Sequence, residues 1–266
     1  MRNVFKNRVE IIPVKHMNVN QFSLGATKFG FLLLHKDPGP TSHDLIAQLR
    51  RITGIKKIGH AGTLDPFASG LLIVGIGREN TKDLGQFIGL AKTYEAIFLL
   101  GAKSTTDDRM GEIYPCDPSA SFPNEQMIQS TIQSFIGPTE QIPPQYAAIK
   151  IQGKKMYELA RLGKIVDAKP RHVTIFSFNL HAVEYLNKPN RLIRLKTTIS
   201  CSSGTYIRSI ARDLGEKLGI NGYVQELCRT SIGPFLLSES IHLSELQPEN
   251  WQNYLLPKER LINRLI

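Results

Sequence analysis

The chain has 266 residues, of which 41% are hydrophobic, and its 33 Lys and Arg against 23 Asp and Glu give a formal net charge of +10. This length allows one large domain or two small ones, and no apolar run approaches the ~18 to 20 residues that cross a membrane. The basic excess favours a polyanionic partner, with RNA or DNA ahead of a membrane surface, or it reflects a generally basic proteome.

The cysteines are few and far apart in the sequence: Cys116, Cys201 and Cys228. They form no C-x-x-C pair and no cluster with histidines, which argues against a zinc site. Their odd number argues against a disulfide framework. We therefore expect a reducing compartment, the cytoplasm, and no bound metal.

Residues 1–28 are basic and contain Glu10 as their one acid. We expect an N-terminal extension here, either a disordered arm or a targeting peptide, so organellar import stays open. The same composition would be explained if translation truly begins at Met17 and Met1 is an upstream start.

The first predicted elements are a strand, a helix and a second strand. Residues 29–36 (FGFLLLHK) are a short apolar run that predicts a strand. Thr41 and Ser42 offer an N-cap to a helix whose apolar residues share one face, namely Leu45, Ile46, Leu49 and Ile52. Residues 71–77 (LLIVGIG) predict a buried strand.

The rest of the chain mixes strands and helices. Strands are predicted at 93–100, 172–180 and 191–200, with a hairpin connection at 187–190, and helices at 124–136, 155–162 and 205–219. The order lacks the regular strand–helix alternation of a doubly wound fold. We therefore predict an α+β fold with a mixed, largely antiparallel sheet flanked by helices.

One stretch stands between the first helix and the second strand. GHAGTLDPFASG, residues 59–70, holds a single carboxylate, Asp65, among glycines and a proline. It suits a simple turn, a phosphate-binding loop or a reactive carboxylate on a tight loop. The phosphate-binding alternative is weak, because neither G-x-x-x-x-G-K-[ST] nor G-x-G-x-x-G is present.

Residues 59–82 closely resemble the defining motif of TruB-type tRNA pseudouridine synthases. Further segments resemble that family in the same order, at 32–42, 91–108, 143–163, 201–219 and 224–235. The resemblance covers roughly residues 29–266. It departs from the family at His35 and Asp37, where Asp and Pro are usual, and at Ser104 to Asp108.

The resemblance implies the roles of several residues. Asp65 would be the nucleophile, Tyr94 would stack on the target base, and Arg208 would pair with Asp65. His60 would fill the gap left by the extruded uridine. The residues expected to bind substrate around them are Gly62, Tyr206, Leu227 and Lys36. The basic residues expected to meet phosphates are Lys36, Arg50, Arg51, Lys56 and Lys57.

The implied reaction is isomerisation of uridine 55 in the T-loop of tRNA. It breaks the N1–C1′ bond and rejoins the base through C5, so it needs neither redox cofactor nor metal, and we expect none. Base extrusion would precede the chemistry. The expected partner is the tRNA T-arm, with no membrane, no obligate protein partner and a monomeric enzyme.

Two other functions stay open on the sequence. One is an RNA-binding chaperone that helps tRNA fold, with little or no catalysis. The other is a hydrolase acting at C1′, which would need a second carboxylate such as Asp107 or Asp108.

The resemblance also implies the domain organisation. Residues 29–235 would form the catalytic domain. Residues 236–266 would be the start of a truncated RNA-binding domain, with weaker and more salt-sensitive tRNA binding as the consequence.

Overall fold

A computed structural model describes residues 28–117, 119–147, 150–151, 154–156, 168–186 and 191–265. The predicted extension, except residue 28, lies outside these ranges. So do most of the helix predicted at 155–162 and the hairpin connection predicted at 187–190. No described helix is long and apolar enough to span a membrane.

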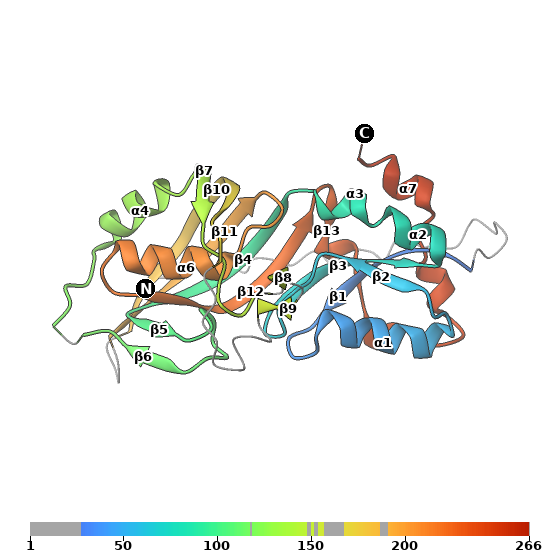
Figure 1. The fold of residues 1–266 in the computed structure, drawn as a ribbon, viewed down its shortest axis with the longest axis horizontal. Coiled ribbons are helices and arrows are strands. Elements are labelled where there is room, and N and C mark those ends of the chain that lie inside the picture. The colour runs from blue at the N-terminus through green and yellow to red at the C-terminus, as the bar shows by residue number, and fades with distance from the viewer. Residues whose placement is uncertain are drawn as a thin grey trace, which may run out of the picture.

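A ten-stranded sheet runs through the molecule (Figure 1). Its order is β14-β1-β3-β12-β4-β11-β10-β7, with β2 paired to β3 and β13 paired to β12. Among the described strands, β1 with β14 and β3 with β12 pair in parallel, and the other pairs of this sheet are antiparallel. The predicted mixed, largely antiparallel sheet is confirmed.

The strands of the main sheet have the following bounds: β1 (Gly30–Lys36), β2 (Ile58–Ala61), β3 (Ser69–Ile76), β4 (Lys92–Leu100), β7 (Gly137–Gln141), β10 (Arg171–Leu186), β11 (Leu192–Cys201), β12 (Gly222–Ile232), β13 (Phe235–Leu236) and β14 (Ile241–His242). Two small hairpins stand apart from it, formed by β5 (Ala102–Ser104) with β6 (Ile113–Pro115) and by β8 (Lys150–Ile151) with β9 (Lys154–Lys155).

The helices are short and lie at the two ends of the sheet (Figure 1). They are α1 (Ser42–Thr53), α2 (Arg78–Asp83), α3 (Gly85–Ile88), α4 (Glu125–Gln133), α6 (Ile207–Lys217) and α7 (Lys258–Ile262), with 3₁₀ turns at Leu237–Glu239, Leu243–Glu245 and Trp251–Tyr254. The predicted N-cap of α1 is confirmed, because the Thr41 side chain accepts from the Asp44 backbone. The helix predicted at 124–136 is α4, which ends at Gln133 with Ser134 as its C-cap, and β7 starts at Gly137.

Strands β1 and β3 are buried on both faces, which explains their continuous apolar sequences. On one face, Leu32, Leu34 and Leu72 pack against α1. On the other, Phe31 and Leu33 join Phe87 of α3 and Leu261 of α7. A separate cluster at the opposite end packs α4 and α6 onto β4, β10 and β11. The loop that carries Asp65 lies where these two halves meet.

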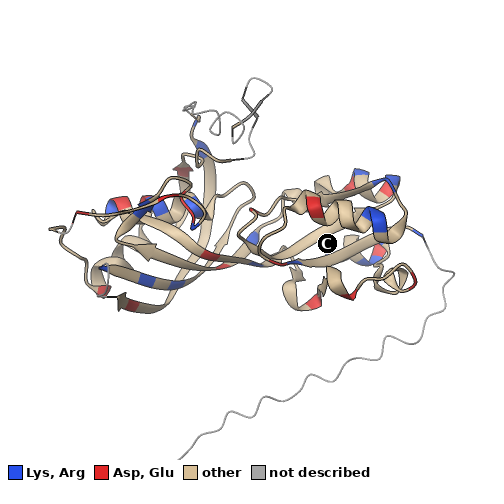
Figure 2. Cartoon of the chain, turned by 90° about the horizontal axis from the view of Figure 1, so that it is seen from below, with Lys and Arg blue, Asp and Glu red and all other residues tan. Residues whose placement is uncertain are grey.

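The C-terminal residues 236–265 pack on the half that contains α1. Trp251 and Leu246 are buried in the cluster under α1, and the backbone of Leu256 exchanges hydrogen bonds with that of Phe31, at 2.9 and 2.8 Å. Basic residues are spread over both halves and mixed with acidic ones (Figure 2). In the described part of the chain, the basic residues are therefore not gathered on one helix or strand.

Candidate active site

Asp65 stands on the loop between β2 and β3, and neighbouring backbone contacts fix that loop. The Ser42 hydroxyl accepts from the Leu64 backbone N–H at 3.1 Å. The Lys36 ammonium donates to the carbonyls of Pro66 and Ala68 at 3.1 and 2.6 Å. The two residues of the loop nearest Asp65 are thus held from β1 and from the start of α1.

Arg208, the second residue of α6, meets the Asp65 carboxylate at two points. Its Nε lies 2.9 Å from Oδ2, and its Nη2 donates to Oδ1 at 3.1 Å. The rest of the guanidinium donates to the backbone carbonyls of Thr106 and Tyr146 at 3.0 and 3.2 Å. The structure therefore brings the predicted pair together. The arginine side chain is 4% exposed, whereas the aspartate side chain is 35% exposed and so remains accessible.

A second carboxylate shares this arginine. Asp108 Oδ2 lies 3.4 Å from Arg208 Nη1. Asp108 also accepts from the Thr106 hydroxyl at 2.7 Å and from the Met110 backbone at 2.9 Å. These contacts occupy its oxygens, so Asp108 is placed to hold Arg208 rather than to supply the acid that a hydrolase needs.

Burial raises the pKa of Asp65 above the ordinary value for a carboxyl group. The charge of Arg208 opposes this effect, Asp108 adds to it, and Lys36 again lowers the pKa. The two-point contact with Arg208 therefore favours the ionised, nucleophilic form of the carboxylate against the effect of burial.

The start of α6 is held by a residue that the sequence did not single out. Gln141, buried at the end of β7, donates to the Tyr206 carbonyl at 3.0 Å and accepts from the Tyr206 backbone N–H at 2.7 Å. These bonds satisfy backbone groups at the helix N-terminus. Because Arg208 follows two residues later, Gln141 also sets where the guanidinium lies.

Most of the predicted substrate-binding residues meet in one cleft of about 470 Å³. Asp65, Arg208, Tyr94, Tyr206 and Leu227 all line it, with Gly62 at its edge. Tyr94, Ala96 and Phe98 alternate along β4 and belong to the same buried cluster. A cleft lined in this way has room for a base next to the carboxylate.

Arg229 is a further residue of the cleft that sequence reasoning missed. Its side chain is 1% exposed. It donates to the carbonyls of Leu71 and Gly62 at 2.9 and 3.1 Å. It pairs across β12 and β4 with Tyr94, and its hydrogen bond and charge oppose the rise that burial causes in the pKa of that phenol. The feature that marks Arg229 is its burial within a strand, and the sequence does not show which residues are buried.

The structure corrects the expectation for Lys36. Its side chain is completely buried and donates to the carbonyls beside Asp65, so it is not presented to a phosphate. The other basic residues, Arg50, Arg51, Lys56 and Lys57, are exposed. Arg50 and Arg51 lie in the last turn of α1, about 12 to 14 Å along the helix from its start beside Leu64, and Lys56 and Lys57 follow the helix.

His60 lies on β2, not on the loop, and it is not part of the cleft wall. It is half-buried, and its ring stands edge-on to that of His43, with centroids 5.5 Å apart. Burial and the nearby charges of His43 and Arg229 lower the pKa of His60 to about 4. The ring is therefore neutral at pH 7, as a stacking group would be.

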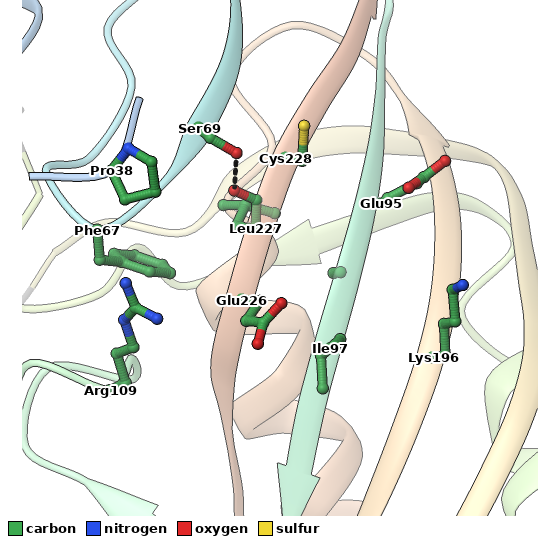
Figure 3. Close-up of a pocket in the computed structure, with 11 residues that line it drawn as sticks. Pro38, Phe67, Ser69, Glu95, Ile97, Arg109, Lys196, Glu226, Leu227 and Cys228 are labelled. Carbon is green, nitrogen blue, oxygen red and sulfur yellow. Dashed lines mark hydrogen bonds between the residues drawn. The ribbon is translucent and has the colours of Figure 1, made fainter. Parts of the chain in front are cut away.

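A second cleft of about 330 Å³ opens on the other face of β4 and β12 (Figure 3). Its charged residues are of both signs: Glu95, Glu226, Lys196 and Arg109. Leu227 reaches both clefts, and its carbonyl accepts from the Ser69 hydroxyl at 3.4 Å. Asp65, Tyr94 and Arg208 do not line this second cleft, so the candidate active site is the first.

Two family models together match residues 50–266. Residues 50–207 match "TruB family pseudouridylate synthase (N terminal domain)", and residues 208–266 match "tRNA pseudouridylate synthase B C-terminal domain". The boundary between the two matches falls inside α6, directly before Arg208.

Curated bacterial proteins named tRNA pseudouridine synthase B are similar to this chain. The protein of Thermobifida fusca is 40% identical over 221 residues, which is 83% of this chain and 75% of that protein. The protein of Corynebacterium efficiens is 42% identical over 218 residues, covering 82% and 72%.

Among solved structures, a Cbf5-Nop10-Gar1 complex contains a chain with a TM-score of 0.65 and 25% identity. The match covers 89% of this chain and 62% of that one. An archaeal box H/ACA Nop10-Cbf5 complex gives a TM-score of 0.65 at 22% identity, which supports the fold.

Proposed function

Because this chain belongs to the TruB family of pseudouridylate synthases, we propose that it isomerises uridine 55 in the T-loop of tRNA to pseudouridine. The contact between Asp65 and Arg208, at the base of a cleft that Tyr94 also lines, carries this proposal. The relatives named tRNA pseudouridine synthase B support tRNA as the substrate.

The first step is capture of an extruded uridine. The cleft of about 470 Å³ lies within the range of small-ligand pockets. Tyr94 stacks on the base, while Tyr206 and Leu227 form the walls. Gly62 lets the backbone approach the nucleotide, and His60 stacks in the gap left in the RNA.

The chemistry then takes place at C1′ and C5. An Asp65 oxygen bonds to C1′ as the N1–C1′ bond breaks, and uracil leaves with the electron pair. After the base turns, C5 bonds to C1′ and the carboxylate leaves. The C5 proton is lost near the Tyr94 hydroxyl and N1 takes up a proton, so atoms and charge balance.

Arg208 acts in both covalent steps. Its two contacts aim one carboxylate oxygen at the sugar, and its charge stabilises the carboxylate when it departs. Asp108 and Gln141 hold Arg208 and its helix in place. Arg229 holds the Tyr94 phenol at the opposite side of the cleft.

We propose further that the enzyme works as a monomer in the cytoplasm, without a protein partner. The three cysteines are free in the structure, which suits a reducing compartment. We also propose that residues 29–235 carry the catalytic machinery and that residues 236–266 belong to the RNA-binding part.

The test is tritium release from an unmodified tRNA transcript labelled at uridine C5. Wild type is compared with Asp65→Asn. Each protein is given the labelled transcript and a transcript that is labelled in the same way but has cytidine at position 55. We expect about one equivalent of tritium per tRNA from wild type acting on the first transcript, and none in the other combinations.

Other outcomes would replace the proposal. Full activity of Asp65→Asn would show that Asp65 is not the nucleophile. Release from the cytidine-55 transcript would move the target to another uridine. Tight tRNA binding without release would favour the folding chaperone, and free uracil among the products would favour the hydrolase.

A further inference from the structure

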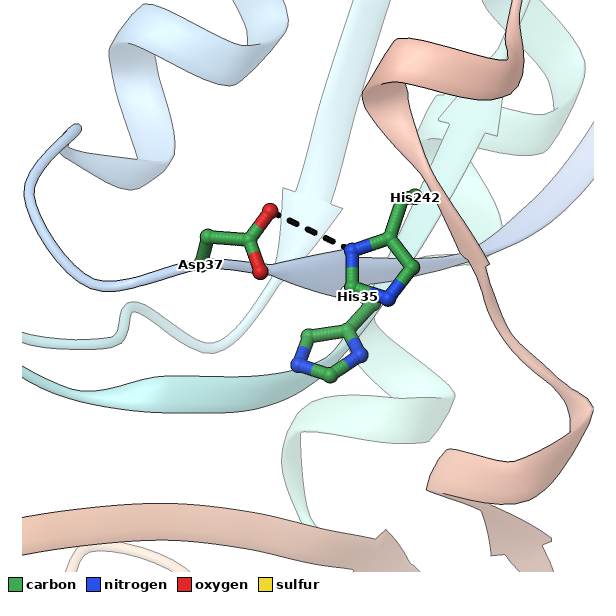
Figure 4. Close-up of side chains that lie close together, drawn as sticks. All are labelled: His35, Asp37 and His242. Carbon is green, nitrogen blue, oxygen red and sulfur yellow. Dashed lines mark hydrogen bonds and ion pairs between the residues drawn. The ribbon is translucent and has the colours of Figure 1, made fainter.

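Two histidines and a carboxylate gather where β14 joins the sheet (Figure 4). His35 lies near the end of β1, Asp37 directly follows that strand, and His242 comes from β14. One donor atom from each lies within 4.8 Å of the other two. We propose that this cluster binds a divalent transition-metal ion, with zinc as the type, and that water completes its coordination.

The backbone places the two histidines opposite each other. His35 and His242 are partners in the parallel register of β1 and β14. The Glu245 carboxylate accepts from the His242 backbone N–H at 2.7 Å, which holds the turn that follows β14. The separation of the two imidazoles is thus set by the sheet rather than by loose surface chain.

Strand alternation keeps the neighbouring cation out of the cluster. His35 and Asp37 are two residues apart and share one face, so Lys36 between them points to the other. Its ammonium is buried against the carbonyls of Pro66 and Ala68. It also donates to the backbone carbonyl of Asp37 at 3.2 Å, so Lys36 contacts the backbone next to the cluster, and the side chains that form the cluster are one carboxylate and two imidazoles.

The donor geometry is close to that of a bound ion. His242 Nδ1 lies 3.2 Å from Asp37 Oδ2. Tetrahedral zinc with bonds of about 2.0 to 2.1 Å has ligand atoms about 3.3 Å apart. The ring centroids of His35 and His242 are 4.2 Å apart with planes inclined by 27°. Binding an ion therefore requires the His35 ring to turn from this stacked position so that one of its nitrogens becomes the third ligand. Two imidazoles and a carboxylate are ligands that zinc accepts.

The position of the cluster suggests what an ion would do. The side chains of His242 and Asp37 are 43% and 59% exposed, so an ion and water can reach them. β14 is a two-residue edge strand held to β1 by one short stretch of pairing. An ion bound to both strands would fasten the C-terminal segment to the half of the molecule that carries Lys36 and the Asp65 loop.

The experiment measures zinc binding to the purified full chain after treatment with a chelator. A chromophoric zinc indicator competes with the protein, and amide exchange follows the peptide that contains β14. We expect one tight site in wild type and slower exchange in β14 when zinc is present. His242→Gln and His35→Gln should each weaken binding at least tenfold, and Asp37→Asn, which preserves shape, several-fold.

Two matched controls separate this site from others. His172→Gln removes an exposed histidine that lies 3.7 Å from the carboxylate of Glu140 without a third ligand, and His43→Gln breaks the His43 and His60 pair. Both should bind zinc like wild type. Cobalt in place of zinc should show no thiolate absorption, which excludes the cysteines.

Contrary outcomes are clear. The proposal is overturned if wild type binds no zinc, or if all three site variants bind as tightly as wild type. It is also overturned if a control variant abolishes the binding, or if bound cobalt shows thiolate ligation. The Asp37→Asn result keeps the test decisive should a histidine variant fold poorly.

Discussion

Arg208 grips Asp65 at two points, 2.9 Å from Nε to Oδ2 and 3.1 Å from Nη2 to Oδ1. The same guanidinium is anchored from behind by Asp108 and two backbone carbonyls. The carboxylate is therefore held in one orientation while a third of its side chain remains open to the cleft. A planar fork can do this and a single ammonium cannot.

Arg208→Lys should for this reason lower the single-turnover rate of isomerisation by about 100-fold, while tRNA affinity changes little. The acid limb of the pH–rate profile should also move to higher pH. Burial already raises the pKa of Asp65, and loss of the two-point contact removes what opposes that rise. Stopped single-turnover reactions between pH 5 and 8 measure both effects.

Arg212→Lys is the matched control, because Arg212 lies one turn further along α6 and pairs with Asp107 at 3.0 Å. Arg212→Lys keeps a positive charge beside Asp107 and changes no contact with Asp65, so it should cost less than a few-fold in rate. Equal losses in the two variants would mean that the arginines of α6 serve the fold and not the nucleophile.

His60 is predicted to act through its ring and not through a proton. Its pKa is lowered to about 4, so the ring is neutral throughout the pH range of the assay. His60→Phe should keep most of the activity, whereas His60→Ala should lose about tenfold in kcat/KM, the scale of one base-stacking contact. His172→Ala, on the exposed surface of β10, should behave like wild type. An inactive phenylalanine variant would point to proton transfer or hydrogen bonding instead.

The elements, and the residues that meet in the cleft, were easier to predict from the sequence than the contacts around them. Asp65, Tyr94 and Arg208 lie in segments whose pattern resembles a family, and all three line one cleft. Gln141 and Arg229 do their work through partners more than 60 residues away, so no local pattern could reveal them.

Lys36 shows the same limit in another way. In a strand buried on both faces, apolar residues do not alternate with polar ones, so the pattern does not say which way a lysine points. From the sequence, Lys36 is expected to bind substrate and to meet phosphates. The fold instead directs the ammonium inward, to the carbonyls of Pro66 and Ala68.

Arg229 is predicted to act on the reaction through Tyr94. Arg229→Lys keeps the charge but cannot serve Leu71, Gly62 and the phenol together. It should slow single-turnover isomerisation about tenfold in wild type and much less in a Tyr94→Phe background, because the two residues form one unit. Tritium release in the four proteins measures this. The same fold-loss in both backgrounds would show that Arg229 only stabilises the sheet.

Lys36 should give the enzyme an alkaline limb. Burial lowers its pKa to about 8, so the ammonium loses its proton as the pH rises through that value. One hydrogen bond to the loop and the charge beside Asp65 are lost together, and activity should fall. Lys36→Met should be slower at pH 7 and lack this limb.

Rising pH should increase the contribution of Lys36 to folding stability, whereas it lowers activity. Between pH 8 and the unfolded value near 10.5, the unfolded chain binds the Lys36 proton and the folded chain does not, so folding is favoured as the pH rises. The free energy of unfolding of wild type minus that of Lys36→Met should increase across this window by about 1 to 3 kcal/mol. Denaturant titrations at pH 7, 8, 9 and 10 measure it, and a difference that is flat or falls with pH would contradict the buried ammonium.

Gly70 is predicted to be required for space as well as for backbone freedom. Its φ is +118°, and a Cβ would stand 2.4 Å from the backbone N and O of Arg229 on β12. Gly54, at the C-cap of α1, has a φ of +70° with nothing within 4 Å of a Cβ. Gly54→Ala should cost about 1 kcal/mol, from backbone strain alone.

Gly70→Ala should cost about 3 kcal/mol or more, because β12 must move away from β3 or β3 must bend. That movement displaces Arg229 and, through its bond to Gly62, the loop that carries Asp65. The variant should therefore lose activity at temperatures where it is still folded, whereas Gly54→Ala should not. Thermal unfolding and tritium release on the same preparations compare the two, and equal effects would mean that the close approach of β3 and β12 is not what requires a glycine.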